Sequence, residues 1–209
     1  MKGNFNLYAL LLALILVILG LLWKQKNLPS AENGETNPVI AAIMERKSVR
    51  NYTAEPVSRE SLELLAKSGM AAPTAGNIQP WEFIAIDDKG ILQQLSQVQP
   101  YVGMAAKAPA AIVVCGNMHD YQGKERMREF WVQDTSAATE NILLAAESLK
   151  LGAVWAGIHP DAERVAKVQK ILRLPEYLIP LNIIVIGYPA GGEQPKNKWK
   201  AERLHWNNW

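Results

Sequence analysis

Four short apolar runs, separated by segments long enough for helices, most strongly constrain the fold of this 209-residue chain. Each run is rich in Ile, Val and Ala with little polar alternation, which is typical of strands in a sheet covered on both faces. The sequence therefore predicts an α+β fold with a central sheet flanked by helices. The four predicted strands are Phe83–Ile86, Ala111–Gly116, Ala153–Ala156 and Asn182–Gly187.

Capping residues place the helices between these runs. Ser58 is the expected N-cap of one helix, and Asp161 that of another, which runs to Leu172 and cannot continue past Pro175. Met127–Leu149 is predicted to be one long helix with apolar residues around most of its circumference. Such a helix is either the core helix of a monomer or a helix that turns one side to a second subunit.

The N-terminal segment differs in composition from the rest. Leu7–Trp23 is a run of 17 uncharged, mostly aliphatic residues, and as a helix it would extend about 26 Å, close to the ~30 Å of a bilayer core. No good signal-peptidase site follows it. We expect residues 1–26 to form a single-pass membrane anchor, 27–37 a flexible linker, and 38–209 the folded domain. The α-amine and Lys2 before the run balance Lys24 and Lys26 after it, so charge leaves the orientation undecided.

The composition of the body excludes several functional classes. Three of the 22 Lys and Arg, and none of the 20 Asp and Glu, lie in residues 1–30, so the body is near neutral and a nucleic-acid partner is not expected. Cys115 is the only cysteine and lies in an apolar run, which predicts a buried strand thiol. The three histidines are too scattered for a metal site.

Residues 46–50 concentrate positive charge. If the chain is extended there, Arg46, Ser48 and Arg50 point to the same side. Two guanidinium groups and a hydroxyl then form a site suited to a phosphate. A cationic helix end or a solvated charged run would have the same sequence.

A second polar segment, the amide loop (Ala72–Trp81), leads into the first predicted strand. Two prolines stiffen it, and Gly76 allows a close approach of the backbone to a ligand. Asn77 and Gln79 offer both donors and acceptors, which suit the edge of a flat heterocycle. An ordinary helix-to-strand loop would use the same residue types.

Taken together, these motifs resemble those of the nitroreductase family of FMN-dependent oxidoreductases. The departures from the family pattern are Lys47 in place of Arg and Thr74 in place of Ser. The resemblance spans Val39 to Trp209. It rests on Arg46–Tyr52, Pro56-Val57, the amide loop, Val132–Ala146, Leu151–Ile158 and Ile186–Pro189.

The resemblance implies a nitroreductase-like fold with a mostly antiparallel or mixed sheet, an FMN cofactor and a homodimer with FMN at its interface. Catalysis would be centred on the flavin, without a catalytic side chain. A backbone N–H at Gly157 would hydrogen-bond flavin N5. The implied cofactor-binding residues are Arg46, Lys47, Ser48 and Arg50 at the phosphate and ribityl chain, Pro73, Thr74, Ala75 and Asn77 from the partner subunit at the ring, and Ala156 with Gly157 over the flavin.

The C-terminal tail is expected to complete the phosphate site. Lys198 best matches the late cation of the family, with Lys196 or Lys200 as substitutes, although the three could also be a solvated run. The last residues, Leu204–Trp209, include two tryptophans and almost no charge, so we expect them to pack, across the dimer if one forms.

The resulting hypothesis is a ping-pong oxidoreductase that passes hydride from NAD(P)H through FMN N5 to a nitroaromatic or quinone acceptor. A membrane anchor favours the quinone. Two alternatives stay open. One is a membrane-tethered flavoprotein that takes electrons from a donor other than a nicotinamide. The other is a reductive dehalogenase or a flavin-fragmenting enzyme of the same fold.

Overall fold

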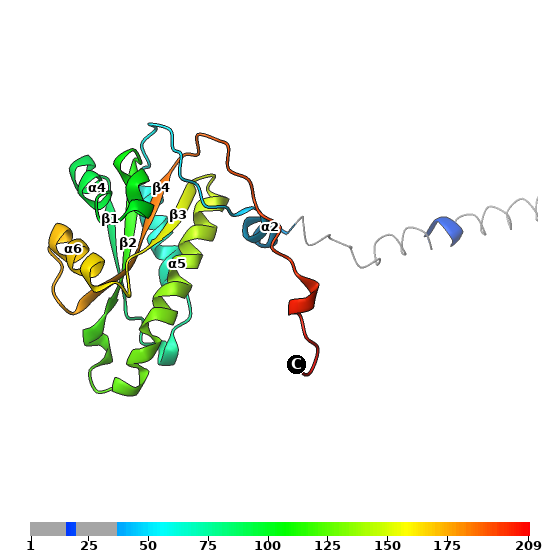
Figure 1. Cartoon of the computed structure of the whole chain (residues 1–209). Helices are drawn as coiled ribbons and strands as arrows, with labels where there is room; N and C mark the ends of the chain where they lie inside the picture. The colour runs from blue at the N-terminus through cyan, green and yellow to red at the C-terminus, as the bar shows by residue number, and fades with distance from the viewer. Residues whose placement is uncertain (1–15, 20–36) are drawn as a thin grey trace, which may run out of the picture. The chain divides into compact units, whose positions relative to one another are not determined.

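The computed structural model describes residues 16–19 and 37–209, and residues Ala42–Trp209 form a compact unit. Its centre is a four-stranded sheet in the order β1-β2-β4-β3 (Figure 1). Each neighbouring pair is antiparallel. All four predicted strands are confirmed, and none of the described pairs in this sheet is parallel. The strands are β1 (Trp81–Ile86), β2 (Ala110–Asn117), β3 (Gly152–Gly157) and β4 (Leu178–Gly187).

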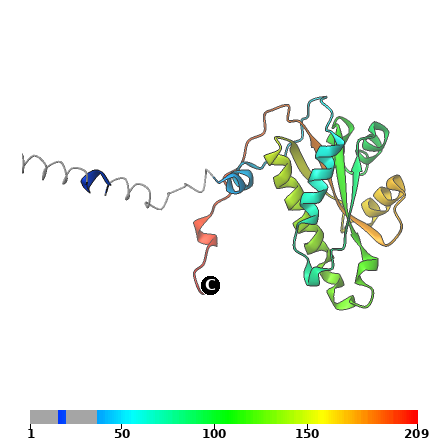
Figure 2. The ribbon, with the colours of Figure 1, turned by 180° about the vertical axis from the view of Figure 1, so that it is seen from behind.

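Helices cover both faces of this sheet, as the apolar runs predicted. On one face lie α4 (Lys89–Leu95), α6 (Ala162–Leu172) and the 3₁₀ helix Pro100–Ala106, and on the other α3 (Arg59–Met70) and α5 (Trp131–Ser148). Figure 2 shows α3 and α5 side by side. Residues 110–115 of β2 are fully buried between the two layers.

The predicted caps are present. The Ser58 hydroxyl accepts the N–H of Ser61 at 3.1 Å at the start of α3, and Asp161 accepts the N–H of Arg164 at 3.0 Å at the start of α6. The latter helix ends at Leu172, as predicted. Arg173 follows it in a left-handed conformation (φ 54°), two residues before the proline expected to stop the helix.

The prediction of one helix over 127–149 is wrong at its N-terminal end. The α-helix begins at Trp131, and residues 125–130 form a 3₁₀ helix instead. The N–H of Met127 bonds to the carbonyl of Lys124 three residues earlier, not four, which gives the tighter turn. From Trp131 onward the helix contacts α3 and all four strands of the sheet.

The predicted membrane segment 1–26 and the linker 27–37 lie almost wholly outside the described residues. Residues 16–19 are helical and Asn37 precedes α2 (Pro38–Glu45). Among the residues that the structure describes, none belongs to a helix long and apolar enough to cross a membrane.

The C-terminal tail extends away from the sheet (Figure 1). Trp206 is 80% and Trp209 101% exposed. The expected packing of these tryptophans is therefore not met within one chain.

Candidate active site

The cationic segment (Arg46–Arg50) lies along the outer edge of β3. The N–H of Val49 donates to the carbonyl of Ala153 at 3.0 Å, and Ser48 forms a parallel bridge to the same residue. The Val49 side chain is buried against Gly152. Because side chains alternate along an extended segment, Ser48 and Arg50 point away from the core. The chain is thus extended here, as the phosphate-site hypothesis required.

Tyr52 holds the same segment in place through its hydroxyl group. Its hydroxyl bonds to the Val49 carbonyl at 2.6 Å and lies 3.0 Å from the Val185 carbonyl of β4. Burial, more than the nearby Glu193 carboxylate, raises the pKa of Tyr52 well above its usual range, so the phenol stays a neutral donor. The backbone of the cationic segment is therefore fixed to two strands.

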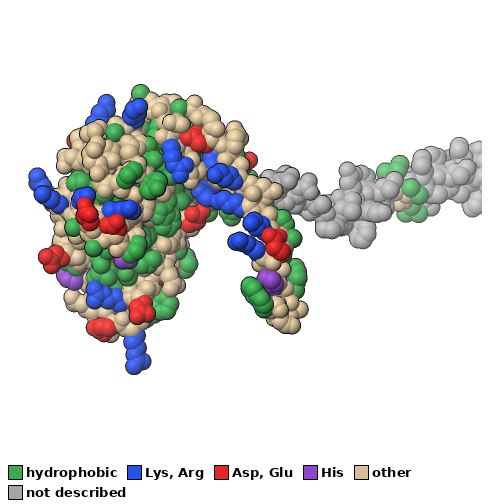
Figure 3. Space-filling model, viewed as in Figure 1, with side chains coloured by type: hydrophobic (Ala, Val, Ile, Leu, Met, Phe, Trp, Pro, Cys, Tyr) green, Lys and Arg blue, Asp and Glu red, His purple; other side chains and the backbone are tan. Residues whose placement is uncertain are grey.

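The side chains of this segment line a groove of about 940 Å³ together with the first part of the tail. The lining includes Arg46, Lys47, Ser48 and Arg50 from the cationic segment and Lys196 and Lys198 from the tail, whereas Lys200 does not line it. Figure 3 shows cationic side chains gathered where the tail leaves the body. The structure thus brings the tail lysine and the cationic segment together, as expected.

The cations of this groove are not equivalent. Arg46 forms an ion pair with Glu140 at 3.2 Å, and Lys47 with Glu147 at 3.0 Å, both acids of α5. The guanidinium group of Arg50 has no acidic partner within 4.0 Å in residues 42–209, and its Nη1 makes only a long contact of 3.4 Å to the Ser48 carbonyl. Arg50 is thus the arginine with a guanidinium group available for an incoming anion.

Glu193 is a groove residue that sequence reasoning missed. Its Oε1 accepts the N–H groups of Arg50 at 2.9 Å and Asn51 at 3.2 Å. The first of these bonds lowers the pKa of the carboxyl most, so Glu193 is an anion. It anchors the tail to the cationic segment. No motif marks it, because its role depends on where the tail runs.

The amide loop packs against the start of α5, away from this groove. The N–H of Ala75 donates to Oδ1 of Asp134 at 2.9 Å, and the hydroxyl of Tyr121 donates to Oδ2 at 3.0 Å. Asp134 is buried, so these bonds fix the loop to the helix. Sequence reasoning missed Asp134 as well, although an acid among the apolar residues of a helix was a visible signal.

The backbone of this loop is strained. Gly76, Asn77 and Gln79 all have φ between 55° and 58°, a left-handed conformation that costs free energy for the two residues with a Cβ. Met127 fills the space beside Gly76, since a Cβ there would come within 2.8 Å of its Cε. Met127 therefore covers Gly76 on the side to which a Cβ would point.

Gly157 ends β3, four residues beyond the attachment of the cationic segment at Ala153. A Cβ built on Gly157 would meet no atom within 4 Å. Asn182 lies opposite Gly157 on β4 and is buried. The Oδ1 atom of Asn182 has no hydrogen-bond partner among the described residues. Ala156 beside it is buried. One edge of the sheet therefore carries both the cationic groove and an open space over a glycine.

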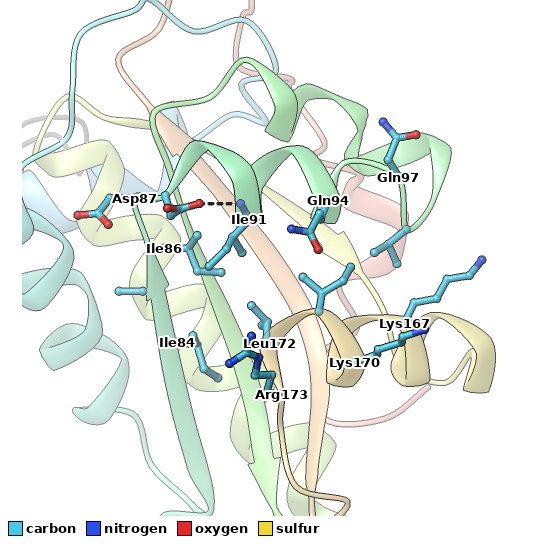
Figure 4. A pocket seen from close by; sticks show the side chains of 14 residues that line it. Ile84, Ile86, Asp87, Ile91, Gln94, Gln97, Lys167, Lys170, Leu172 and Arg173 are labelled. Atoms are coloured by element: carbon cyan, nitrogen blue, oxygen red, sulfur yellow. Dashed lines mark hydrogen bonds between the residues drawn. The ribbon is translucent and has the colours of Figure 1, made fainter.

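A second groove of about 940 Å³ lies between α4 and α6 (Figure 4). Ile84 of β1 and Ile91 of α4 line it, together with Lys170 of α6 and Arg173 just after that helix. It contains none of the site residues predicted from the sequence.

Comparison with known proteins identifies the family. The sequence model of the Nitroreductase family matches residues 43–99 and 91–188. The chain belongs to the nitroreductase family. A Methanothermobacter thermautotrophicus protein described as an NADH dehydrogenase/NAD(P)H nitroreductase is 37% identical over 82% of this chain and 87% of its own length.

Solved structures of nitroreductase-family members share the fold. One from Parabacteroides distasonis, of the same description, superimposes with a TM-score of 0.77 at 42% identity, covering 83% of this chain and 99% of its own. An FMN-dependent nitroreductase from Clostridium difficile gives a TM-score of 0.73 at 27% identity, covering 81% and 99%. This chain is therefore an oxidoreductase of the nitroreductase family.

Proposed function

We propose that this protein is an FMN-dependent oxidoreductase that takes hydride from NAD(P)H and reduces an electron-poor acceptor, a nitroaromatic or a quinone. The observation that carries the proposal is the edge of β3, which carries the cationic groove at Ser48 and Arg50 beside Ala153 and, four residues further on, the open space over Gly157. Membership of the family and the FMN-dependent relative support the same cofactor.

The residues of this edge fit FMN. Arg50 offers an unpaired guanidinium for a phosphate, Lys196 and Lys198 add point charges to the same groove, and Ser48 adds a hydroxyl. The absence of any atom near a Gly157 Cβ leaves room for a flat ring against the strand end. When bound, FMN would supply the chemistry of two-electron transfer by hydride.

The protein's own part in the reaction is binding and orientation. Arg46 and Lys47, held by acids of α5, would contribute positive potential near the phosphate rather than direct bidentate contacts. Because consecutive residues of a strand direct their N–H groups to alternate edges, Gly157 shares the outward orientation of Ala153. Its N–H would donate to flavin N5.

We infer a homodimer, in which Pro73, Thr74, Ala75 and Asn77 of the partner subunit border the flavin ring. In one chain the amide loop lies against α5 and does not line the cationic groove, so a second copy would have to supply it. The exposed tryptophans of the tail support such an association, since large apolar side chains at a solvated terminus mark interaction sites.

We also propose that Leu7–Trp23 anchors the domain to a membrane, on the basis of its length and composition. Attachment to a membrane would favour a quinone as acceptor. If the domain lies on the side without nicotinamides, the donor would be another reductant, such as a membrane quinol. Protease accessibility in intact cells would determine the side.

The test of the proposed function is flavin reduction by nicotinamides. The purified full chain should bind FMN, and NADH or NADPH should bleach its absorbance in a stopped-flow experiment. A protein that binds no FMN contradicts the assignment. Bound FMN that dithionite reduces but neither nicotinamide bleaches would instead favour the flavoprotein with another donor.

A further inference from the structure

Gln99 is a buried amide whose side chain reaches the end of β3. Its Nε2 donates to the carbonyl of Gly157 at 2.6 Å. The residue is only 6% exposed, and its Oε1 has no hydrogen-bond partner among the described residues. Burying an acceptor without a partner costs free energy. The bond from Nε2 to Gly157 is therefore the contact that explains why a glutamine occupies this position.

The backbone of Gln99 is itself firmly held. Val98 and Val102 on either side of it are buried in the core between the sheet and α4. The N–H of Val102 donates to the Gln99 carbonyl at 3.2 Å and starts the 3₁₀ helix Pro100–Ala106. Gln99 therefore reaches Gly157 from a fixed position.

The peptide that follows Gly157 is bonded at both ends. Its carbonyl accepts from Gln99, and its N–H, which belongs to Ile158, donates to the carbonyl of Leu181 at 2.9 Å. Glycine rotates more freely than any other residue, and this glycine lies where the strand ends. Without the bond from Gln99, only the bond to Leu181 would restrain this peptide.

The peptide after Gly157 lies beside the Gly157 N–H, because the N–H and the carbonyl of one strand residue point to the same edge. Ala153 directs its carbonyl outward to Val49, and alternation along the strand gives Gly157 the same outward direction. Its N–H is therefore not used by the ladder to β4. A change in ψ at Gly157 would move its carbonyl and the chain that follows, and so would alter the open space beside that donor.

We propose that Gln99 is a positioning residue of the hydride-transfer site: by holding the carbonyl of Gly157 it fixes the peptide after Gly157, and so keeps open the space in which the Gly157 N–H would face flavin N5. This inference rests on the proposed FMN-dependent function. The role is indirect, because Gln99 acts through Gly157 and contacts neither cofactor nor substrate.

Gln99→Glu provides a test in which the pH changes the protonation state of the new side chain. A buried carboxyl has a raised pKa, so at pH 5 the neutral acid can still donate to the Gly157 carbonyl. At pH 8 the carboxylate would repel it. Relative to wild type at each pH, we expect Gln99→Glu to bind FMN normally at pH 5 and about tenfold more weakly at pH 8. Gln93→Glu, an exposed substitution on α4, is the matched control and should show no such dependence.

Hydrogen exchange of the FMN-free protein gives a second readout. The Ile158 N–H should exchange about tenfold faster in Gln99→Leu than in wild type, while amides of β2 stay unchanged. If Gln99→Leu fails to fold, Gln99→Glu at pH 5 and pH 8 provides the same comparison in one protein.

The outcomes separate the two proposals. Wild-type protein that binds no FMN contradicts the proposed function, whatever Gln99 does to Ile158. FMN binding and Ile158 exchange that stay at wild-type values in both Gln99 variants across pH 5–8 would overturn the role of Gln99 alone.

Discussion

The N–H of Val49 donates to the carbonyl of Ala153 across 3.0 Å. This bond attaches the cationic segment to the same strand that ends at Gly157. The phosphate end and the ring end of the proposed FMN site therefore share one rigid element, and their spacing, about 13 Å along four residues, is set by β3. Changes where Val49 meets β3 should affect FMN binding without touching a charged residue.

Gly152→Ala tests this attachment. A Cβ at Gly152 would lie 2.6–2.9 Å from the side chain of Val49, so the cationic segment must shift off the strand. We expect a loss of about 1–3 kcal/mol in the free energy of unfolding and weaker FMN binding, measured by thermal denaturation and fluorescence titration.

Gly103→Ala is the matched control. No atom lies within 4 Å of a Cβ at Gly103, so this variant should keep wild-type stability and affinity. Equal behaviour of the two alanine variants would show that Val49 and β3 are not tightly packed.

Arg50→Ala tests the phosphate contact. Losing a charge-assisted hydrogen bond costs about 1.5–3 kcal/mol, so FMN affinity should fall roughly 10–100-fold while the melting temperature stays near wild type. Arg46→Ala should also weaken binding, but it leaves Glu140 without its partner. Arg59→Ala, at an exposed arginine paired with Asp87, should bind FMN normally. Retention of FMN by Arg50→Ala would indicate a solvated charge.

Asp134→Ala tests the support of the amide loop. It removes the acceptor of both Ala75 and Tyr121, and we expect a loss of about 1–3 kcal/mol in the free energy of unfolding. Asp134→Asn keeps an acceptor for Ala75 and should recover most of the stability. If the two variants are equally unstable in urea denaturation, the charge of Asp134 matters more than its geometry.

The sequence predicted the sheet well because its information is local. Each strand is a continuous apolar run, and Ser58 and Asp161 mark helix starts through bonds to residues three positions away. The start of α5 was misjudged because apolar residues continue through Met127 into the 3₁₀ helix, and periodicity does not separate the two helix types.

The site was predictable in part. Arg46, Ser48 and Lys198 belong to motifs, and the structure places them in one groove. Gln99, Asp134 and Glu193 act through contacts with residues about 60 to 140 positions away. These contacts form only when the chain folds, so the spacing of residues along the sequence does not predict them.

Cys115 should be inert in the folded protein. It is fully buried in β2, and burial raises the pKa of its thiol to about 12. Below a pH of about 8.5, the pKa of a thiol in the unfolded chain, Cys115 is neutral in both states and the full stability from burying it is present. Above that pH the thiol ionises in the unfolded state but not in the folded one, so this stability is lost as the pH rises. A disulfide reagent at pH 8 should label Cys115 only in urea. Rapid labelling without urea would contradict the burial of β2.

Removal of residues 204–209 tests whether the tail joins two copies of the chain. Trp206 and Trp209 are almost fully exposed in one chain, and a tryptophan at the centre of an interface is often worth 2 kcal/mol or more, about 30-fold in affinity. The shortened protein should therefore dissociate at concentrations where the full chain is a dimer by analytical ultracentrifugation. Tyr101→Ala, which removes an exposed aromatic far from the tail in sequence, should leave the dimer intact. A shortened protein that stays dimeric would mean that the subunits associate through α5 or another surface, and that the tail tryptophans serve a different partner.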